Sequence, residues 1–339
     1  MNTPKKPALI LLLTLLCATA FAQIEISIPG ADGETAFTFR ADTPDPAIKQ
    51  MPKEIAAKRQ SAPNEFIRLL ADYINEKSEN DYDRVKKAHD WVALNIRYDV
   101  QSFFSGRHLS QSPDSVIKRG TAVCAGYSGA FGMICDALEI GCVTVSGHGQ
   151  GYGSGLFKSE NVALSNHAWN IVTIEEKKYQ IDTTWDSGYL NGSAFQAEYT
   201  TDYLFIDPDV FIYRHFPGED ADQLLDPPLS AEEFSLLPLL RPRFFQVLES
   251  WPDLPRITEI NAGEVLKFEF STIPEYELIY GWYTQTGTKV GIDVFSGKKD
   301  VYTISPPKLK PGKYALRLWA QKSGSKQYIS LGEFGFLVK

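Results

Sequence analysis

One cysteine, one histidine and one aspartate in the middle of the chain have side chains that could together transfer an acyl group. This chemistry needs a thiolate, an imidazole within hydrogen-bond reach of it, and a third group that orients the ring. Cys124, His167 and Asp182 would supply these three groups. Spacings of 43 and 15 residues mean little alone, because single residues of these types are common. The case for a triad therefore depends on the elements that would hold it.

Each member of the candidate triad lies at the end of an expected element. Cys124 begins a helix expected over 124–139, and the positive end of a helix dipole lowers a thiol pKa. His167 precedes a strand expected over 168–174, and Asp182 ends a second strand over 178–182. A hairpin at 175–177 would bring the histidine and the aspartate side by side. The backbone N–H of Cys124 could in addition help to hold an oxyanion.

The helix expected over 124–139 is rich in glycine. Its apolar residues recur at i, i+4, i+7 and i+11 from Tyr127 and form one face, while Gly126, Gly129 and Gly132 lie on other faces. Glycine in a helix costs stability. We therefore expect another part of the chain to come close to this helix.

The other two cysteines after Cys124 are expected in the core. Cys135 lies eleven residues further along the same helix, ~16 Å from Cys124, too far to share one histidine. Seven helical residues would separate Cys135 from Cys142 by ~10 Å, which exceeds the ~7 Å that a disulfide allows. No disulfide is expected.

Several residues are candidates for supporting roles in the site. Gln101, His108 and Gln111 are candidates for a second oxyanion donor, although each could equally be an ordinary loop residue. Trp169 and Trp185 would either shield the ion pair from water or serve as core aromatics.

The remaining histidines show no metal-binding pattern. His89 lies on or beside the apolar stripe of a helix expected over 81–96 and is interpreted as a packed core residue. His148 and His215 are interpreted as loop or packing residues. Because no zinc or calcium ligand spacing occurs, no metal or cofactor is expected.

Four short motifs, in this order, resemble the core motifs of the transglutaminase-like superfamily of papain-type cysteine domains. They are Ile96-Arg97-Tyr98-Asp99, Ala122-Val123-Cys124-Ala125-Gly126-Tyr127-Ser128, Asn166-His167-Ala168-Trp169-Asn170 and Ile181-Asp182-Thr183-Thr184-Trp185-Asp186. Residues 203–208 and 211–217 and the glycine-rich stretch before His167 resemble the kyphoscoliosis-peptidase branch. The resemblance covers residues 81–239.

The resemblance implies a role for each member of the candidate triad. Cys124 would be the nucleophile, His167 the general base and then the general acid, and Asp182 the group that fixes the imidazole. One departure is visible, since many relatives have glycine one or two residues before the cysteine, where this chain has Ala122 and Val123. This difference affects the backbone just before Cys124, where a substrate oxyanion would be held.

The first 22 residues have the pattern of an export signal. Lys5 and Lys6 precede an apolar run over 8–16, and Ala20-Phe21-Ala22 offers small residues before a cut at Gln23. The run is too short to span a bilayer. Lipidation at Cys17 is disfavoured because the residue before it, Leu16, is not small. We expect a secreted or periplasmic protein that has no transmembrane anchor once the signal is removed.

Composition restricts the partners. The formal net charge of −8 becomes −10 without the two signal lysines, which argues against nucleic acid. The chain is 43% hydrophobic and has ample length for two cores. The expected partner is a protein or peptide substrate, such as a cell-envelope or extracellular protein.

The predicted fold is α+β. A leader with one or two short strands and a first helix over 23–80 would precede a transglutaminase-like domain over 81–239, in which the nucleophile's helix packs on an antiparallel sheet. Short segments separated by Pro and Gly then predict an immunoglobulin-like β-sandwich over 240–339, with strands at 244–248, 265–270, 278–283, 301–304, 314–321 and 328–336.

Two classes of function remain open. The first is an exported cysteine enzyme that attacks peptide or glutamine amides through a thioester, with peptidase favoured over transamidase by analogy with the resembling branch. The second is a non-catalytic binding or scaffold protein that uses the groove and the sandwich. The ring side chains of residues 276–283 could meet a peptide or a glycan, although strand alternation would place most of them in the core.

Overall fold

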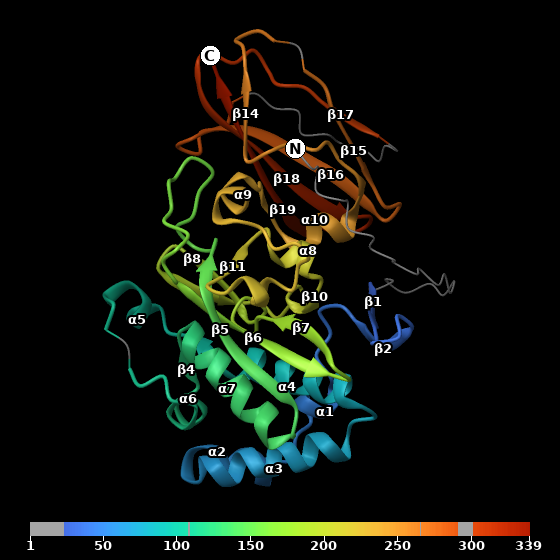
Figure 1. Ribbon diagram of the computed structural model, residues 1–339, viewed down its shortest axis with the longest axis vertical. Coiled ribbons are helices and arrows are strands. Elements are labelled where there is room, and N and C mark those ends of the chain that lie inside the picture. Colours follow the sequence, from blue (N-terminus) through green and yellow to red (C-terminus); the bar gives the residue numbers. More distant parts are fainter. Residues whose placement is uncertain (1–23, 108, 265, 291–300) are drawn as a thin grey trace. The chain divides into compact units, whose positions relative to one another are not determined.

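The computed structural model describes residues 24–107, 109–264, 266–290 and 301–339 (Figure 1). The chain forms two compact units, each made of separate stretches of sequence. The first comprises residues up to Gly147, Ser165–Pro208 and Pro217–Leu224, and the second comprises His148–Leu164, Asp209–Phe216 and Leu225–Lys339. The α+β class predicted from the sequence is confirmed.

The first unit begins with a hairpin and four helices. The antiparallel strands β1 and β2 pair from Glu25 opposite Arg40. The elements are β1 (Glu25–Pro29), β2 (Thr35–Arg40), α1 (Pro46–Lys49), α2 (Lys53–Ser61), α3 (Pro63–Glu76) and α4 (Asp81–Asn95). The predicted leader contains two helices, α1 and α2, in addition to its strands and the expected first helix. Helix α2 starts after Pro52 and contains the helix-forming run Glu54-Ile55-Ala56-Ala57-Lys58.

Helix α4 begins and ends where the sequence predicts. The side chain of Asn80 accepts a hydrogen bond from the Asp83 N–H and caps the helix. After α4 the chain forms β3 (Arg97–Tyr98), α5 (Val100–Ser105), α6 (Pro113–Arg119), β4 (Thr121–Ala122) and α7 (Cys124–Ala137). The short strands β3 and β4 pair in parallel, with Arg97 opposite Thr121.

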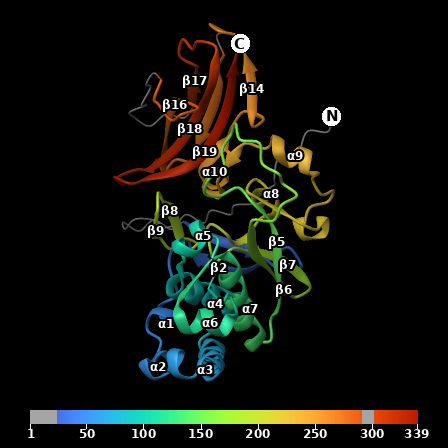
Figure 2. The same ribbon diagram turned by 90° about the vertical axis from the view of Figure 1, so that its left-hand side faces the viewer.

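An antiparallel sheet covers these helices on one side, as Figure 2 shows. Its strands lie in the order β10-β7-β6-β5, and α7 packs against β6. The strands are β5 (Gly141–Gly149), β6 (His167–Ile174), β7 (Lys177–Ile181) and β10 (Leu204–Ile206), with the hairpin β8 (Gly188–Asn191) and β9 (Ala194–Ala197) beside them in the chain. The core between helices and sheet includes the fully buried Trp91, Phe131 and Val172.

The turn between β6 and β7 forms as predicted, although it lacks the usual residues. Glu175 and Glu176 adopt positive φ angles of 51° and 66°. Two positive φ angles are the geometry of the tight hairpin turn that matches strand twist. This turn keeps β6 and β7 in register over Asn170–Ile181, and so fixes where His167 and Asp182 lie.

The first part of the glycine-rich stretch before His167 belongs to a strand. Strand β5 continues through Gly149, and residues 147–150 are buried. The His148 ring bonds Glu160 at 2.8 Å, which makes it a packed residue. Glycine has no side chain to clash in a tightly packed strand, so here it permits close packing and not only mobility.

The second unit contains two β-sheets. One has the order β12-β19-β18-β16 with β14 parallel to β19, and the other has the order β13-β15-β17. Rings from the two sheets meet, with Phe268 of β15 at 5.5 Å from Phe336 of β19. The strands are β12 (Leu239–Leu240), β13 (Leu248–Ser250), β14 (Ile257–Ile260), β15 (Phe268–Thr272), β16 (Tyr276–Thr284), β17 (Tyr302–Ile304), β18 (Gly312–Lys322) and β19 (Tyr328–Val338). The predicted sandwich is therefore present, with one parallel pair.

The strand predicted over 244–248 is wrong. These residues form most of helix α10 (Pro242–Val247), and only Leu248 enters β13. Pro242 takes the first helical position, where its fixed φ suits a helix. Phe244 and Val247, three residues apart, are both fully buried on one helical face.

Four more short elements complete the described part of the chain. They are α8 (Pro208–Phe211), β11 (His215–Pro217), a 3₁₀ turn η1 (Asp220–Gln223) and α9 (Ala231–Leu236). Within the described residues no helix is both long enough and apolar enough to cross a bilayer.

Candidate active site

The first two members of the site are held by the β6–β7 hairpin. His167 is the first residue of β6, and Asp182 directly follows β7. The His167 Nε2 lies 2.7 Å from Asp182 Oδ2. The other carboxylate oxygen, Oδ1, accepts hydrogen bonds from the N–H groups of Thr184 (2.9 Å) and Trp185 (3.2 Å). The carboxylate is thus fixed at both oxygens and in turn fixes the imidazole.

Cys124 supplies the third member from the start of α7. It is the first helical residue, after Val123 in an extended conformation. Its side chain is partly exposed, and the His167 side chain and the Ala168 N–H are near enough to lower its pKa. The structure thus pairs His167 with Asp182, and Cys124 is the thiol whose pKa His167 lowers.

The pKa shifts of the cysteine and the histidine favour an ion pair. Burial alone would raise the pKa of the Cys124 thiol, but the hydrogen bond and charge of His167, with the Ala168 N–H, lower it below its ordinary value. Burial alone would lower the pKa of His167, but Asp182 and the Cys124 thiolate raise it to about 10. Opposite shifts of this kind stabilise a thiolate next to an imidazolium.

Two indole rings lie beside the imidazole. The ring centroid of Trp185 is 5.1 Å from that of His167, and the centroid of Trp169 is 6.0 Å away. Trp169 is fully buried and donates its indole N–H to Gln180 at 2.9 Å, whereas Trp185 is partly exposed. Apolar rings next to the ion pair strengthen its electrostatic attraction, because they keep water from one side of it.

Gln111 has a different contact from that of an oxyanion donor. Its Oε1 accepts a hydrogen bond from the Val123 N–H at 3.1 Å, and its Nε2 donates to the Leu109 carbonyl at 2.8 Å. The amide thereby holds the residue that precedes the nucleophile. Gln101 is an exposed residue of α5, and His108 lies outside the described residues.

Tyr98 is a neighbour of the nucleophile that the sequence reasoning missed. Burial and the negative charge of Cys124 raise the pKa of its phenol. Its ring is held between Phe103 (5.8 Å) and Phe195 (6.2 Å), and no described residue hydrogen-bonds its hydroxyl. The signal was available, because Tyr98 belongs to the first of the four motifs, and a phenol is a hydrogen-bond donor.

A second cluster of buried polar side chains includes Asp186, four residues after Asp182. The His89 ring bonds Asp186 Oδ2 through Nε2 at 3.0 Å and Asp90 Oδ1 through Nδ1 at 3.2 Å. Lys86 Nζ bonds Asp90 Oδ2 at 2.6 Å. All four side chains are buried. The prediction that His89 is a packed and satisfied core histidine is confirmed.

This cluster joins α4 to the segment that carries Asp182 and Trp185. Asp186 Oδ2 also accepts a hydrogen bond from the Tyr203 N–H at 3.0 Å, and Oδ1 accepts one from the Thr200 hydroxyl at 2.6 Å. Burial alone would lower the pKa of His89, but its bonds to Asp186 and Asp90 raise it. The His89 ring thus joins two buried carboxylates of the core through its two nitrogens.

Cys135 has neither the exposure nor the pKa of a nucleophile. Cys135 is fully buried, and burial with the neighbouring Cys142 raises its thiol pKa well above the ordinary value. Cys142 is partly exposed on β5, and the thiols of Cys124, Cys135 and Cys142 are all free. The pKa of Cys124 is lowered, whereas that of Cys135 is raised.

Comparisons with known proteins agree with this geometry. Residues 68–182 match the sequence profile of the transglutaminase-like superfamily. The kyphoscoliosis peptidase of Mus musculus is 26% identical over 300 residues, covering 85% of this chain and 44% of that protein. The kyphoscoliosis peptidase of Homo sapiens is 28% identical over 220 residues, covering 64% and 33%. The chain therefore spans less than half the length of these relatives.

The similarity to solved structures is low overall. A crystal structure of a protein described as a TGase is 20% identical and has a TM-score of 0.28, with 43% of this chain and 36% of that chain covered.

Proposed function

We propose that this chain is an exported cysteine enzyme that attacks amides through a thioester. Its residues 68–182 form a domain of the transglutaminase-like superfamily, in the branch of the kyphoscoliosis peptidases. The observation that carries the proposal is the bond between His167 and Asp182, together with the lowered pKa of Cys124 at the start of α7, to which His167 contributes. The favoured reaction is peptide hydrolysis, because the relatives with the longest matches are named peptidases.

The first half of the reaction forms the thioester. The Cys124 thiolate attacks the carbonyl carbon of the substrate amide and forms a C–S bond. The oxygen becomes an anion that the Cys124 backbone N–H can stabilise. The imidazolium of His167 then gives its proton to the amide nitrogen, the C–N bond breaks, and the amine leaves.

The second half restores the thiolate. The neutral His167 takes a proton from a water molecule, or from an amine acceptor, as that molecule attacks the thioester carbonyl. The C–S bond breaks, the acid or the new amide leaves, and Cys124 is again a thiolate beside an imidazolium. Asp182 stays ionised throughout and keeps His167 Nδ1 directed at the sulfur.

The proposed substrate is a protein or peptide outside the cytoplasm, since export in the periplasmic or secreted direction is part of the proposal. The alternative binding function has less support from the ring side chains of residues 276–283. Tyr276, Tyr280 and Trp282 are buried in the sandwich core, and Tyr283 is partly exposed. The enzyme therefore remains the better-supported reading.

The test is the rate of iodoacetamide alkylation at Cys124 as a function of pH, read by peptide mass spectrometry. The reagent needs no substrate recognition and reacts with the thiolate only. Because the Cys124 pKa is lowered, the rate should stay high well below pH ~8. Cys142 in the same sample, also partly exposed, is the internal control.

Replacement of the partner base separates an assembled triad from an ordinary thiol. In His167→Ala the rate at pH ~6.5 should fall by about tenfold or more, because a thiol of pKa ~8.5 is mostly protonated there. Equal profiles in both proteins, each with a midpoint near pH ~8.5, would reject the ion pair. Peptide products formed with and without an added primary amine would then distinguish hydrolysis from transamidation.

A further inference from the structure

Asn170 belongs to one of the four motifs, and the proposed reaction gives it no part. It lies on β6, and its side chain is fully buried. Its Nδ2 donates a hydrogen bond to the Ser128 carbonyl of α7 at 3.1 Å. A carbonyl can only accept, so this contact sets the orientation of the amide. The bond joins the strand that begins at His167 to the helix that begins at Cys124.

The bond lies close to the start of both elements. Asn170 follows His167 by three residues of β6, which is ~10 Å of extended chain. Ser128 follows Cys124 by four residues, which is about one turn of α7. The Ser128 hydroxyl in turn donates to the Cys124 carbonyl at 3.0 Å. The amide therefore connects the first turn of the nucleophile's helix to the beginning of the histidine's strand.

Closely packed atoms surround the Asn170 amide. A Cβ at Gly132, one turn after Ser128, would lie 3.9 Å from the Asn170 Nδ2, so a longer side chain there would meet the amide. The Cys142 Sγ and the Thr144 Oγ1 of β5 each lie 3.5 Å from the same nitrogen. Helix α7 thus comes close to the sheet at this point, and glycine permits the approach.

The other end of the amide is unfavourable for the fold. Asn170 Oδ1 is buried, and no described residue hydrogen-bonds it. A buried carbonyl oxygen without a partner costs free energy, and a leucine of similar size would avoid that cost. The contribution that an amide makes here, and a leucine cannot, is the bond to α7.

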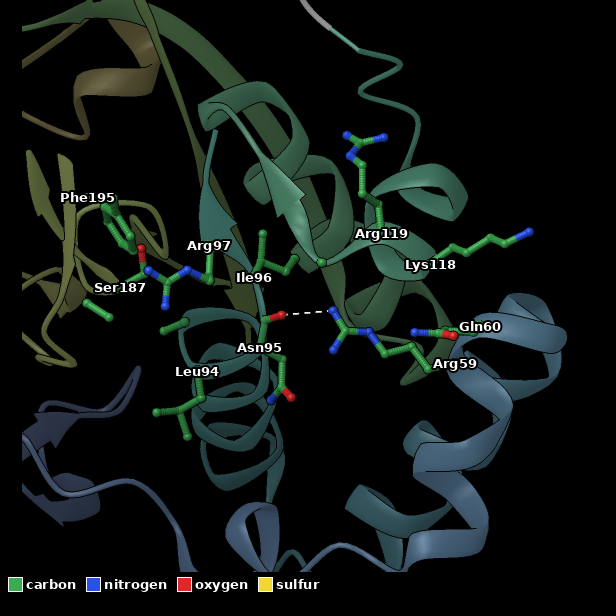
Figure 3. Close-up of a pocket in the computed structure, with 13 residues that line it drawn as sticks. Arg59, Gln60, Leu94, Asn95, Ile96, Arg97, Lys118, Arg119, Ser187 and Phe195 are labelled. Atoms are coloured by element: carbon green, nitrogen blue, oxygen red, sulfur yellow. Dashed lines mark hydrogen bonds between the residues drawn. The ribbon is translucent and has the colours of Figure 1, made fainter. Parts of the chain in front are cut away.

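Tyr127 is a second anchor of the same turn, and its partners border a cavity. Its hydroxyl donates to the Ile96 carbonyl at 2.6 Å and lies 3.2 Å from the Ser187 Oγ. Figure 3 shows Ile96 and Ser187 among the residues that line a cavity of about 340 Å³. A group beside a cavity can shift more easily than one that packed atoms surround. The Asn170 amide is therefore the firmer of the two anchors.

From these contacts we infer that Asn170 is a positioning residue, which holds the first turn of α7 against β6 so that Cys124 and His167 meet in the right geometry. It acts through the Ser128 carbonyl. A displacement of ~1 Å between reacting groups can slow a reaction about a hundredfold. The effect on the reaction rests on the proposed function, whereas the link between α7 and β6 does not.

The experiment shortens two neighbouring residues of β6. Asn170→Ala removes the amide. Val172→Ala is the matched control, because Val172 is also fully buried on β6 in the core between helices and sheet. Asn170→Leu is a second variant, which removes the donor and leaves no cavity. The thermal midpoint and the pH profile of iodoacetamide alkylation at Cys124 are measured for each protein. Rates are compared with the wild type and not with Cys142, whose Sγ lies beside the amide.

Both Asn170 variants should lose about tenfold or more of the alkylation rate at pH ~6.5, because a thiol without its imidazolium partner is mostly protonated there. Val172→Ala should lower the thermal midpoint and keep the wild-type profile. A wild-type profile in both Asn170 variants would overturn the proposal, and so would an equal loss of rate in Val172→Ala. If one of the two Asn170 variants does not fold, the other decides.

Hydrogen exchange of residues 124–131 keeps this result separate from the enzyme proposal. An ordinary thiol profile in the wild type would reject the ion pair, but the link could still be measured. Faster exchange of this peptide in the Asn170 variants than in Val172→Ala would support the link, because the first turn of α7 would have lost its anchor. Equal exchange in all variants would overturn it.

Discussion

The reactivity of Cys124 results from two opposed effects on one thiol. Burial raises the thiol pKa, and His167 and the Ala168 N–H together lower it by more, so that the pKa lies below the ordinary value. Cys135 has burial and no cationic neighbour, and its pKa is raised well above the ordinary value. The histidine, more than the helix position or the exposure, therefore separates a nucleophile from a core cysteine.

Tyr98 is expected to act on the oxyanion and not on the thiolate. Its phenol lies near Cys124, and no described residue bonds its hydroxyl. We expect Tyr98→Phe to slow acylation by p-nitrophenyl acetate by about a hundredfold, the lower end of the range for loss of one oxyanion donor. The burst of p-nitrophenol measures that step.

Alkylation by iodoacetamide is the control reaction for Tyr98→Phe, because no oxyanion forms when the thiolate is alkylated. Its rate should be the same in the variant and in the wild type. Parallel losses in both reactions would show that Tyr98 supports the geometry of Cys124, and no loss in either would remove it from the mechanism.

The start of α7 depends on the absence of a side chain at one position. A Cβ at Gly126 would lie 2.5 Å from Gln111 Oε1 and 2.6 Å from the Ala122 Cβ, which is closer than real contacts allow. Gln111 also holds the Val123 N–H. This is the close approach that a glycine-rich helix predicted, and it occurs directly beside the nucleophile.

Gly126→Ala should therefore lower the free energy of unfolding by ~1–3 kcal/mol, the usual cost of overpacking, and should shift the alkylation profile of Cys124 to higher pH. Gly129→Ala is the control on the same helix, since its Cβ would meet only Pro113 at 3.4 Å. The control should gain up to about 1 kcal/mol from helix propensity. Urea denaturation measures both, and equal effects would contradict the packing argument.

The His89 cluster should position Asp182 as well as stabilise the core. Asp186 bonds His89, Thr200 and Tyr203, and Tyr203 accepts the Asp182 N–H through its carbonyl at 3.0 Å. Asp186→Asn breaks the buried pair, so we expect a loss of ~3–5 kcal/mol. We also expect the alkylation rate at low pH to fall, because Asp182 would no longer be aligned with His167.

Lys87→Met is the control for Asp186→Asn. Lys87 is buried on the same helix and bonds Asp83 and Asp45, but none of these residues contacts the segment from Asp182 to Tyr203 in the described hydrogen bonds. It should lose stability and keep the wild-type alkylation profile. An unchanged profile in Asp186→Asn would mean that the cluster is structural only.

Sequence pattern predicted the elements of the site better than their connections. The helix at Cys124 and the hairpin at 175–177 follow from spacing and turn position. The bond between His89 and Asp186 joins residues 97 positions apart, and no periodicity reports such a pair. The same limit explains Gln111, whose amide looked like an ordinary loop residue until the fold placed it against Val123.

At the level of the chain, domain order along the sequence did not predict the units of the structure. Residues 148–164 and 209–216 belong to the same compact unit as the sandwich, although they come between parts of the first unit in sequence. Composition and turn residues mark where the pattern of secondary structure changes along a chain, but contacts between distant segments decide which segments fold together.

Export is the remaining property of the whole chain, and it has a direct test. The pattern over residues 1–22 predicts cleavage after Ala22 in a bacterial host with a secretory pathway, giving a chain that begins at Gln23 and carries a net charge of −10. Intact mass and amino-terminal sequencing of the extracytoplasmic fraction check this. Ala20→Asp and Ala22→Asp should block cleavage, because the peptidase site needs small residues there.

Cys17→Ser separates cleavage from lipid anchoring. If the chain is a free exported protein, this variant should be processed and released like the wild type, because Leu16 does not suit a lipidation site. A wild-type protein that stays with membranes and is released only by Cys17→Ser would replace cleavage after Ala22 with an anchored form. A chain that stays in the cytoplasm at its full mass would remove export from the proposal, and would leave the acyl-transfer chemistry of Cys124 to be tested on cytoplasmic proteins.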